Sequence, residues 1–311
     1  MHSVVSPGTS IALYADDTKI WRNINSDEDS MILNNDIAAL QRWAFSNLMT
    51  FHPNKCKVVN VSHKNKLLSV LPFYNFPYSL CGILLDHCES ETDLGIIIHE
   101  RLSWSAQYGV LLSKATQQFN LLRRTCYFVK NLRHKRTLYL TIVRSIFEHG
   151  NCIWSPSSDS IINKFESIQK RAVKWILGEQ FYSYSKAYYV QKLVDLDILP
   201  MAQKFILNDM ILFYKIVNEL VQISLPSYIN SRTNTRSASL ESKLAIDKDS
   251  VQHPIKNVFG HSFFPRCIST WNRLPRDVRS CENLGLFTSG IKSYLWKIVL
   301  GAFDDSDYAD F

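Results

Sequence analysis

The chain has 311 residues, of which 46% are hydrophobic and 20% are charged, and its 35 Lys and Arg against 28 Asp and Glu give a net charge of +7. This apolar content is enough to bury a core and excludes a disordered chain, while the length allows one large or two ordinary domains. The seven cysteines are odd in number and include no C-x-x-C pair, which argues against a disulfide framework and favours a reducing compartment.

Several functional classes lack their sequence signals. The chain has no secretory leader pattern, and its longest uncharged stretch, residues 67–85, is interrupted by Pro72, Asn75 and Pro77. There is no G-x-S-x-G elbow, Walker loop or G-x-G-x-x-G motif, and the Cys and His spacing does not fit a zinc site. We therefore expect an intracellular protein, cytoplasmic or nuclear, with no membrane partner.

The first predicted element is a hairpin. Short apolar runs at residues 11–13 and 20–21 flank the sequence Tyr14-Ala15-Asp16-Asp17. Neighbouring side chains in a strand point to opposite faces, so a turn is needed for Asp16 and Asp17 to lean toward one divalent ion. Carboxylate oxygens suit Mg²⁺ or Mn²⁺. A bare Asp-Asp pair is more often an ordinary surface turn, but the flanking strands favour a metal-binding hairpin here.

A helix is predicted next, because Ser26 followed by Asp29 resembles a capping box. Its apolar face would contain Leu33, Ile37, Leu40, Ala44 and Leu48. We then expect a strand that Asn54-Lys55 opens and that runs to residue 61, followed by a strand pair at residues 80–85 and 94–98.

From residue 102 the apolar pattern is helical, and a first long helix would bury Trp104, Tyr108, Leu111, Ala115, Phe119, Leu122 and Cys126. A second helix is expected over Thr137–Phe147. A third would begin near Asp159, whose carboxylate can cap it, and end before Gly178. The apolar positions of a later helix are Ile206, Met210, Phe213, Val217 and Leu220.

Two later segments are polar. Residues 231–242 are rich in Ser, Thr and Arg and predict a loop, while the acidic tail at residues 303–311 predicts disorder. The alternating sequence from Val194 to Ile198 contains Asp195 and Asp197, which could be mistaken for a second carboxylate pair. Such alternation is typical of a half-buried strand or a short amphipathic turn, so we do not favour a metal site there.

The strongest charge bias lies in residues 102–147, which contain eight basic residues and no acidic one. Ordinary solvated helices mix both signs, so a long stretch without any acid suits a phosphate backbone. A basic solvated face without a partner remains the alternative. The eight residues are Lys114, Arg123, Arg124, Lys130, Arg133, Lys135, Arg136 and Arg144.

Tyr-Ala-Asp-Asp-Thr between two apolar strands resembles the metal-binding hairpin of reverse transcriptases, in particular those of non-LTR retrotransposons of the jockey-like group. Asp93 stands where the family usually has an aromatic residue, and His52 where it usually has Asn. Further blocks resemble the family in the same order over almost the whole chain: residues 40–43, 51–58, 93–96, 142–150, 168–172, 262–266 and 271–275.

The resemblance implies an α+β, mostly helical fold. Residues 1–100 would be the remaining half of a polymerase palm, residues 101–180 a basic helical thumb, and residues 181–311 a mainly helical C-terminal region with the acidic tail. For the block at residues 271–275 we expect a packing role. A partial palm sheet would carry an unpaired apolar edge, which is an aggregation liability.

The resemblance also implies an RNA-directed DNA polymerase that works on an RNA template and a DNA primer. Asp16 would be the principal metal ligand, Asp17 a weaker one, and Tyr14 would lie near the primer end. Lys55 would protonate the departing pyrophosphate, with Lys57 a less favoured candidate; a solvent-exposed lysine at a strand start explains Lys55 equally well. The basic residues expected to contact the primer–template phosphates are Lys114, Arg123, Arg124, Lys130, Arg133, Lys135 and Arg136.

Polymerases of this type hold two metal ions with carboxylates from two strands, one of them upstream of the hairpin. The first acidic residue in this chain is Asp16. We therefore expect a truncated polymerase that is inactive alone and needs an upstream polymerase half. The alternative is a non-catalytic nucleic-acid-binding module.

Overall fold

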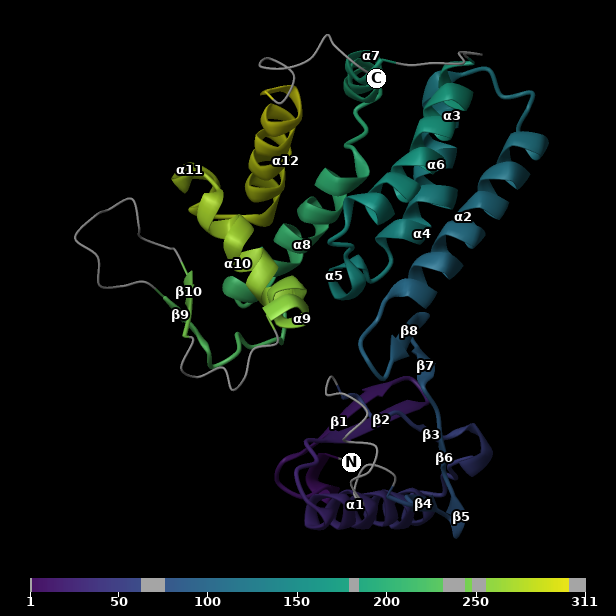
Figure 1. Cartoon of the computed structure of the whole chain (residues 1–311), viewed down its shortest axis with the longest axis vertical. Coiled ribbons are helices and arrows are strands. Elements are labelled where there is room, and N and C mark those ends of the chain that lie inside the picture. Colours follow the sequence, from purple (N-terminus) through teal and green to yellow (C-terminus); the bar gives the residue numbers. More distant parts are fainter. Residues whose placement is uncertain (1, 63–75, 179–184, 232–243, 248–255, 302–311) are drawn as a thin grey trace. The chain divides into compact units, whose positions relative to one another are not determined.

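The computed structural model describes residues 2–62, 76–178, 185–231, 244–247 and 256–301. The chain divides into two compact units, an N-terminal unit of residues 1–106 and a C-terminal unit of residues 107–311, and each is described by itself (Figure 1). The predicted acidic tail and all but Ser231 of the predicted polar loop lie outside the described residues.

The described elements are mixed α and β and mostly helical, as the sequence predicts. The strands are β1 (Thr9–Tyr14), β2 (Asp17–Arg22), β3 (Lys57–Val58), β4 (Ser79–Leu80), β5 (Ile83–Leu84), β6 (Asp86–His87), β7 (Ser90–Asp93), β8 (Ile96–His99), β9 (Ile229–Ser231) and β10 (Leu244–Ile246). The helices are α1 (Asp27–Ser46), α2 (Ser105–Thr125), α3 (Leu132–Leu138), α4 (Ser145–Glu148), α5 (Asn151–Trp154), α6 (Asp159–Leu177), α7 (Lys186–Asp195), α8 (Met201–Val217), α9 (Lys256–His261), α10 (Phe263–Arg273), α11 (Arg276–Arg279) and α12 (Leu284–Gly301).

In the N-terminal unit, β1 and β2 form the predicted antiparallel hairpin, and α1 packs against β2 and β4. The predicted cap of α1 is confirmed, because the Ser26 hydroxyl accepts a hydrogen bond from the Asp29 backbone N–H at 3.2 Å. Arg22 at the end of β2 pairs with the Asp29 carboxylate at 3.1 Å, which ties the hairpin to the start of the helix. A small core forms where Ile37 of α1 meets Tyr78 and Leu80.

Two predictions for this unit are wrong at helix and strand ends. Leu48 is not part of the buried face of α1, because the helix ends at Ser46 and the Asn47 side-chain amide donates to the Trp43 carbonyl at 2.8 Å. The strand expected from Asn54-Lys55 does not begin there. Pro53 has a fixed φ and no N–H, and residues Pro53–Lys55 form a 3₁₀ turn, so only Lys57–Val58 form a strand, which pairs in parallel with β6.

The predicted pairing of residues 80–85 with residues 94–98 is also wrong. Each segment instead belongs to its own hairpin, β4–β5 and β7–β8. Both turns place two successive residues at positive φ, and the second is a glycine each time, Gly82 at 74° and Gly95 at 81°. Turns of this kind match the twist of a tight hairpin and so favour local pairing. The described strands form five two-stranded sheets instead of one continuous sheet.

In the C-terminal unit, α2 to α6 and α8 surround buried aromatic rings. Phe165 is central, since its ring lies 5.0 Å from that of Phe147, 5.9 Å from that of Trp154 and 5.7 Å from that of Phe205. The predicted second helix lies within one helical run, α3, a π-helical segment (Tyr139–Arg144) and α4.

The predicted C-terminal end of α6 is confirmed, and the predicted N-terminal cap is wrong. Gly178 terminates the helix at a φ of 72°, as expected of a C-terminal glycine. The N-cap residue is Ser158, however, and Asp159 is the first helical residue. Ser158 makes no capping side-chain hydrogen bond, so Asp159 contributes its charge to the first turn.

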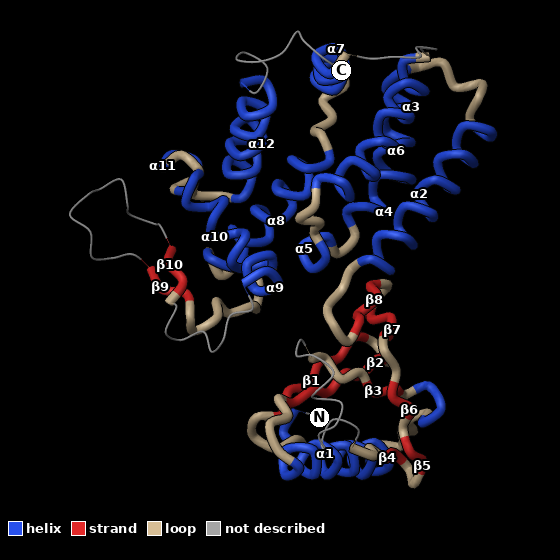
Figure 2. The backbone as a smooth tube through the Cα atoms, viewed as in Figure 1, coloured by secondary structure: helices blue, strands red, loops and turns tan. Residues whose placement is uncertain are grey.

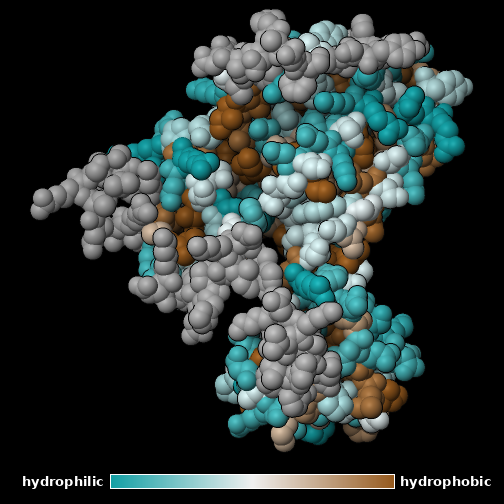
Figure 3. Space-filling view, viewed as in Figure 1, coloured by the Kyte–Doolittle hydropathy of each residue, from teal (hydrophilic) through white to brown (hydrophobic). Residues whose placement is uncertain are grey.

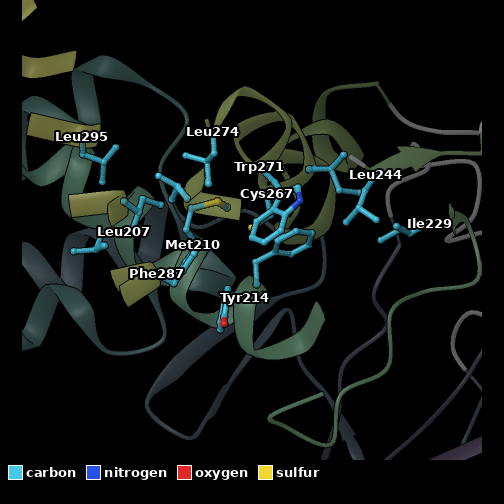
Figure 4. Close-up of a cluster of buried hydrophobic side chains, with 14 of the residues drawn as sticks. Leu207, Met210, Tyr214, Ile229, Leu244, Cys267, Trp271, Leu274, Phe287 and Leu295 are labelled. Carbon is cyan, nitrogen blue, oxygen red and sulfur yellow. The ribbon is translucent and has the colours of Figure 1, made fainter. Parts of the chain in front are cut away.

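A second core joins α8 to β9, β10 and α10–α12 (Figure 4). Trp271 is buried there, with its ring 5.5 Å from that of Phe213 and 5.8 Å from that of Phe287. The packing role expected for this block is therefore confirmed. Leu220 is exposed, contrary to the prediction, because α8 ends at Val217. Figure 2 shows helices as most of this unit.

Trp271→Ala should lower the free energy of unfolding by about 3–5 kcal/mol, because it removes a large buried ring from the centre of this core. Chemical denaturation followed by circular dichroism measures the change. Trp271→Phe, which keeps an aromatic ring, should lose clearly less. A loss below about 1 kcal/mol for the alanine variant would contradict the packing role.

Candidate functional site

The tip of the β1–β2 hairpin is a two-residue turn. Tyr14 pairs with Asp17 in the strand register, so Ala15 and Asp16 form the turn itself. Ala15 has a φ of 51°, in the left-handed region, where a side chain other than glycine costs roughly 1–2 kcal/mol. The hairpin tip is therefore closed at a cost in backbone strain.

The two faces of the hairpin differ. Residues paired across the ladder share a face, and the face that carries Ile11 and Ile20 is turned to the interior of the unit. The opposite face carries Tyr14, Asp17 and Trp21, which are all exposed, and Tyr14 keeps 65% of its surface open. The register therefore leaves an aromatic ring and a carboxylate together on an uncovered face.

Asp16 and Asp17 are both exposed, and neither side-chain carboxylate has a hydrogen-bond or ion-pair partner within the described part of the chain. Two free carboxylates at one tip fit part of the ligand set of a hard divalent cation. No group of three or more His, Cys, Asp or Glu residues that could hold a metal occurs in the described ranges, so the hairpin supplies two such ligands and no third.

The two lysine candidates differ in their surroundings. Lys55 lies in the 3₁₀ turn before β3 and its side chain is exposed, so its catalytic role stays a prediction. Lys57 pairs with Glu91 at 3.1 Å, and this hydrogen bond raises the pKa of Lys57 above its ordinary value. The Lys57 side chain is therefore engaged in an ion pair with Glu91 of β7.

Asp93 at the end of β7 pairs with Lys19 at 2.6 Å. Lys19 lies on the open face of the hairpin, so this ion pair connects β2 to β7.

Within the described residues, three of the eight basic side chains in segment 102–147 donate hydrogen bonds to backbone carbonyls. Arg144 is 3% exposed, donates to the Leu199 carbonyl at 3.0 Å and pairs with Glu148 at 3.2 Å. Arg136 donates to the carbonyl of Leu196 and, at 2.9 Å, to that of Asp197. These contacts hold the α3–α4 run against the segment between α7 and α8.

Lys135 is the third. Its ammonium donates to the Trp175 carbonyl at 2.9 Å near the C-terminal end of α6, a position that favours positive charge, and lies 5.4 Å from the centre of the Trp175 ring. Burial, together with repulsion from Lys130, lowers the pKa of Lys135. The lysine is thus used in packing α3 against α6.

Asp197 belongs to the same network. Its carboxylate pairs with Arg136 at 3.6 Å and with Lys292 at 2.7 Å, while Asp195 pairs with Lys192 at 3.5 Å. Both acids of the alternating segment therefore form ion pairs within the chain.

The exposed basic residues gather at the end of α2. Arg123 and Arg171 of α6 both lie over the buried Phe119 ring, at 5.8 Å and 5.4 Å from its centre. Arg171 also donates to the Asn120 side chain at 3.0 Å. Asn120, Arg123 and Arg124 line a hollow of about 470 Å³. Sequence reasoning missed Arg171 as a member of this group, because it lies outside the acid-free stretch and only folding brings it to Arg123.

The remaining basic residues are exposed but spread apart. Lys130 and Arg133 flank Asn131, which caps α3 by accepting hydrogen bonds from the Arg133 N–H at 2.9 Å and the His134 N–H at 3.2 Å. Lys114 is nine residues before Arg123, which is about half a turn around α2, so these two do not share a face. The structure thus brings together only part of the predicted basic set.

Comparisons with known proteins give a distant relationship. No family model matches the chain, and no solved structure matches it. Over 175 residues it is 26% identical to the Drosophila melanogaster protein described as "Probable RNA-directed DNA polymerase from transposon BS". This match covers 55% of the chain but 19% of the relative, so the chain spans a small part of that protein's length. The similarity supports a relationship to transposon reverse transcriptases.

Within the described residues, no helix combines the length and apolar character that crossing a membrane requires.

Arg136→Gln should lower the free energy of unfolding by about 1–3 kcal/mol, since charged hydrogen bonds to two backbone carbonyls are lost. Arg133→Gln, three residues earlier and exposed, should change it by less than about 0.5 kcal/mol. Urea denaturation of the two variants makes the comparison. Equal effects would show that the intrachain contacts of Arg136 contribute nothing to stability.

Proposed function

We propose that this chain is part of the RNA-directed DNA polymerase of a non-LTR, jockey-like retrotransposon. The observation that carries the proposal is the hairpin tip, where two unpartnered carboxylates adjoin an uncovered strand face that bears Tyr14. The similarity to a transposon polymerase supports it from an independent direction. In this proposal residues 1–100 are palm, residues 101–180 thumb and residues 181–311 a C-terminal region.

In the proposed mechanism Asp16 is the principal ligand of Mg²⁺ or Mn²⁺ and Asp17 a second one. Divalent ions at such a site stabilise the charge that develops on the attacking and leaving oxygens of nucleotidyl transfer. Tyr14 lies beside Asp17 on the open face and would contact the primer end. Lys55 would supply the proton for pyrophosphate. RNA template and DNA primer are the partners, which implies an intracellular setting.

The hairpin alone does not complete the site. A two-metal site needs carboxylates on both sides of the ions, and the described residues offer no third metal ligand near Asp16 and Asp17. We therefore propose that the remaining ligand comes from another polymerase segment, an upstream half, and that this chain by itself does not polymerise.

A second function, non-catalytic nucleic-acid binding, is favoured by the exposed arginines. Arg123, Arg124 and Arg171 present three guanidinium groups from two helices, and none of the three pairs with an acid within the described ranges. In both proposed functions this surface binds the phosphate backbone. Asp16 is required only in the polymerase, where it holds the metal ion.

The isolated chain should show no primer extension with either Mg²⁺ or Mn²⁺, since one carboxylate pair cannot hold two ions in the required geometry. Labelled-primer extension on an RNA template measures this. Template-dependent incorporation that disappears in Asp16→Asn would contradict the prediction and would show that this chain holds a complete site.

The chain should bind nucleic-acid duplexes with little sequence preference, and affinity should fall steeply with salt because bound counterions are released. Replacing both Arg123 and Arg124 with Gln should flatten the plot of log affinity against log salt by about 1.8, or about 0.9 for each lost phosphate contact. Fluorescence anisotropy at a series of salt concentrations gives the slope.

The matched control for this measurement replaces Arg42 and Lys297, which are exposed on α1 and α12, with Gln. It removes the same charge from other helices, and its slope should stay close to that of the unaltered chain. Equal slopes for the two double variants would remove the end of α2 from the binding surface.

A further inference from the structure

The connection between α2 and α3 exposes two neighbouring aromatic rings. Tyr127 keeps 74% of its surface open and Phe128 keeps 65%, whereas Phe119, Tyr139 and Phe147 in the adjoining helices are fully buried. A large aromatic side chain left in water forgoes the stabilisation that burial gives. Two adjacent solvent-exposed rings form an apolar surface that is suited to binding a partner.

The two rings are held in a defined arrangement. Their centres lie 5.8 Å apart and their planes meet at 88°, so the edge of one ring faces the other. The turn is also fixed at both ends. The Val129 N–H donates to the Cys126 carbonyl at 3.2 Å, and Asn131 caps the following helix. A platform with its rings already positioned loses little entropy when it binds.

Basic residues flank the two aromatic residues on both sides in the sequence. Arg123 and Arg124 come just before them, Lys130 and Arg133 just after, and no acid occurs between residues 102 and 147. Figure 3 shows mostly hydrophilic residues over the end of α2, as this composition requires. A partner that fits must offer negative charge and flat π faces together.

We propose that Tyr127 and Phe128 are a stacking platform for the unpaired bases of a single-stranded nucleic acid, whose phosphates bind Arg124, Lys130 and Arg133. The inference rests on the proposed function, because it assigns a single strand of nucleic acid to the same basic surface. In a duplex the bases are stacked on one another, so their faces are closed to protein rings. The platform therefore gives this chain a preference for single strands that phosphate contacts alone do not supply.

A membrane surface would also attract a basic and aromatic segment. Interfacial binding uses a helix with a continuous apolar face opposite a charged one, whereas here the two open rings lie in a short turn between helices. The observations favour single-stranded nucleic acid.

The test compares a fluorescent 12-nucleotide oligo(U) with a 12-base-pair duplex, using anisotropy and the full chain. Replacing Tyr127 and Phe128 with Leu keeps apolar bulk but removes both rings. We expect oligo(U) affinity to fall at least about fivefold for each base that stacks, and duplex affinity to change by less than about twofold. Phe45→Leu is the matched control, since Phe45 is 81% exposed on α1, and it should change neither affinity.

Photo-crosslinking supplies a readout that does not depend on affinity. Oligonucleotides that carry 5-iodouracil should crosslink to the tryptic peptide Thr125–Lys130, which contains both rings and is bounded by Arg124 and Lys130. Crosslinks confined to other peptides would overturn the platform.

Three further results would overturn the proposal: unchanged oligo(U) affinity in the double variant, an equal loss for oligo(U) and duplex, or binding to anionic phosphatidylserine vesicles without binding to oligo(U). If the chain shows ring-dependent oligo(U) binding but never gives Asp16-dependent polymerisation with any polymerase half, the platform stands and the polymerase assignment falls.

Discussion

The pairing register of β1 and β2 is the constraint on which the candidate site depends. Because Tyr14 pairs with Asp17, the turn has room for two residues only, and Ala15 takes a left-handed conformation to close it. The same register assigns Ile11 and Ile20 to the interior of the unit and Tyr14 and Asp17 to the open face. A shift by one residue would exchange the two faces. The Arg22–Asp29 ion pair and the Ser26 cap fix α1 beside this hairpin.

In the C-terminal unit, buried or half-buried arginines have a structural role that a count of charges cannot distinguish from binding. Arg136 and Arg144 donate to backbone carbonyls between α7 and α8. Arg266 of α10 pairs with the buried Asp209 of α8 at 2.8 Å. Because Arg136 and Arg144 already contact carbonyls within the chain, the surface available to phosphate is smaller than the +8 of residues 102–147 suggests. It centres on Arg123, Arg124 and the neighbouring turn.

The sequence predicted local features well where a single residue type has a single physical role. The hairpin tip, the Ser26 cap, the Gly178 terminus and the apolar face of α2 all follow from local chemistry. Prediction from the sequence failed where competing local signals, or residues distant in the chain, determine the structure. Pro53 replaced the expected start of a strand with a 3₁₀ turn, and two glycine turns converted an expected long-range strand pair into two separate hairpins.

The candidate functional residues followed the same division. Asp16 and Asp17 could be found from adjacent residues, whereas the contacts of Lys135 with Trp175 and of Arg171 with Phe119 join residues 40 and 52 positions apart. No periodicity in the sequence reveals such pairs. The exposure of Tyr127 and Phe128 was equally hidden, because aromatic residues in an apolar helical pattern are normally core.

Complementation tests the central claim, that the Asp16 hairpin is one side of a polymerase site, most directly. The chain would be mixed with a polypeptide carrying the fingers and first palm half of a related transposon polymerase, and primer extension would be measured with Mg²⁺. We expect extension in the mixture and not with either polypeptide separately. Extension should be lost with Asp16→Asn and should persist with Asp27→Asn, which removes an exposed carboxylate from the first turn of α1. A mixture that forms a stable complex on primer–template yet extends nothing, or extends equally with Asp16→Asn, would contradict it.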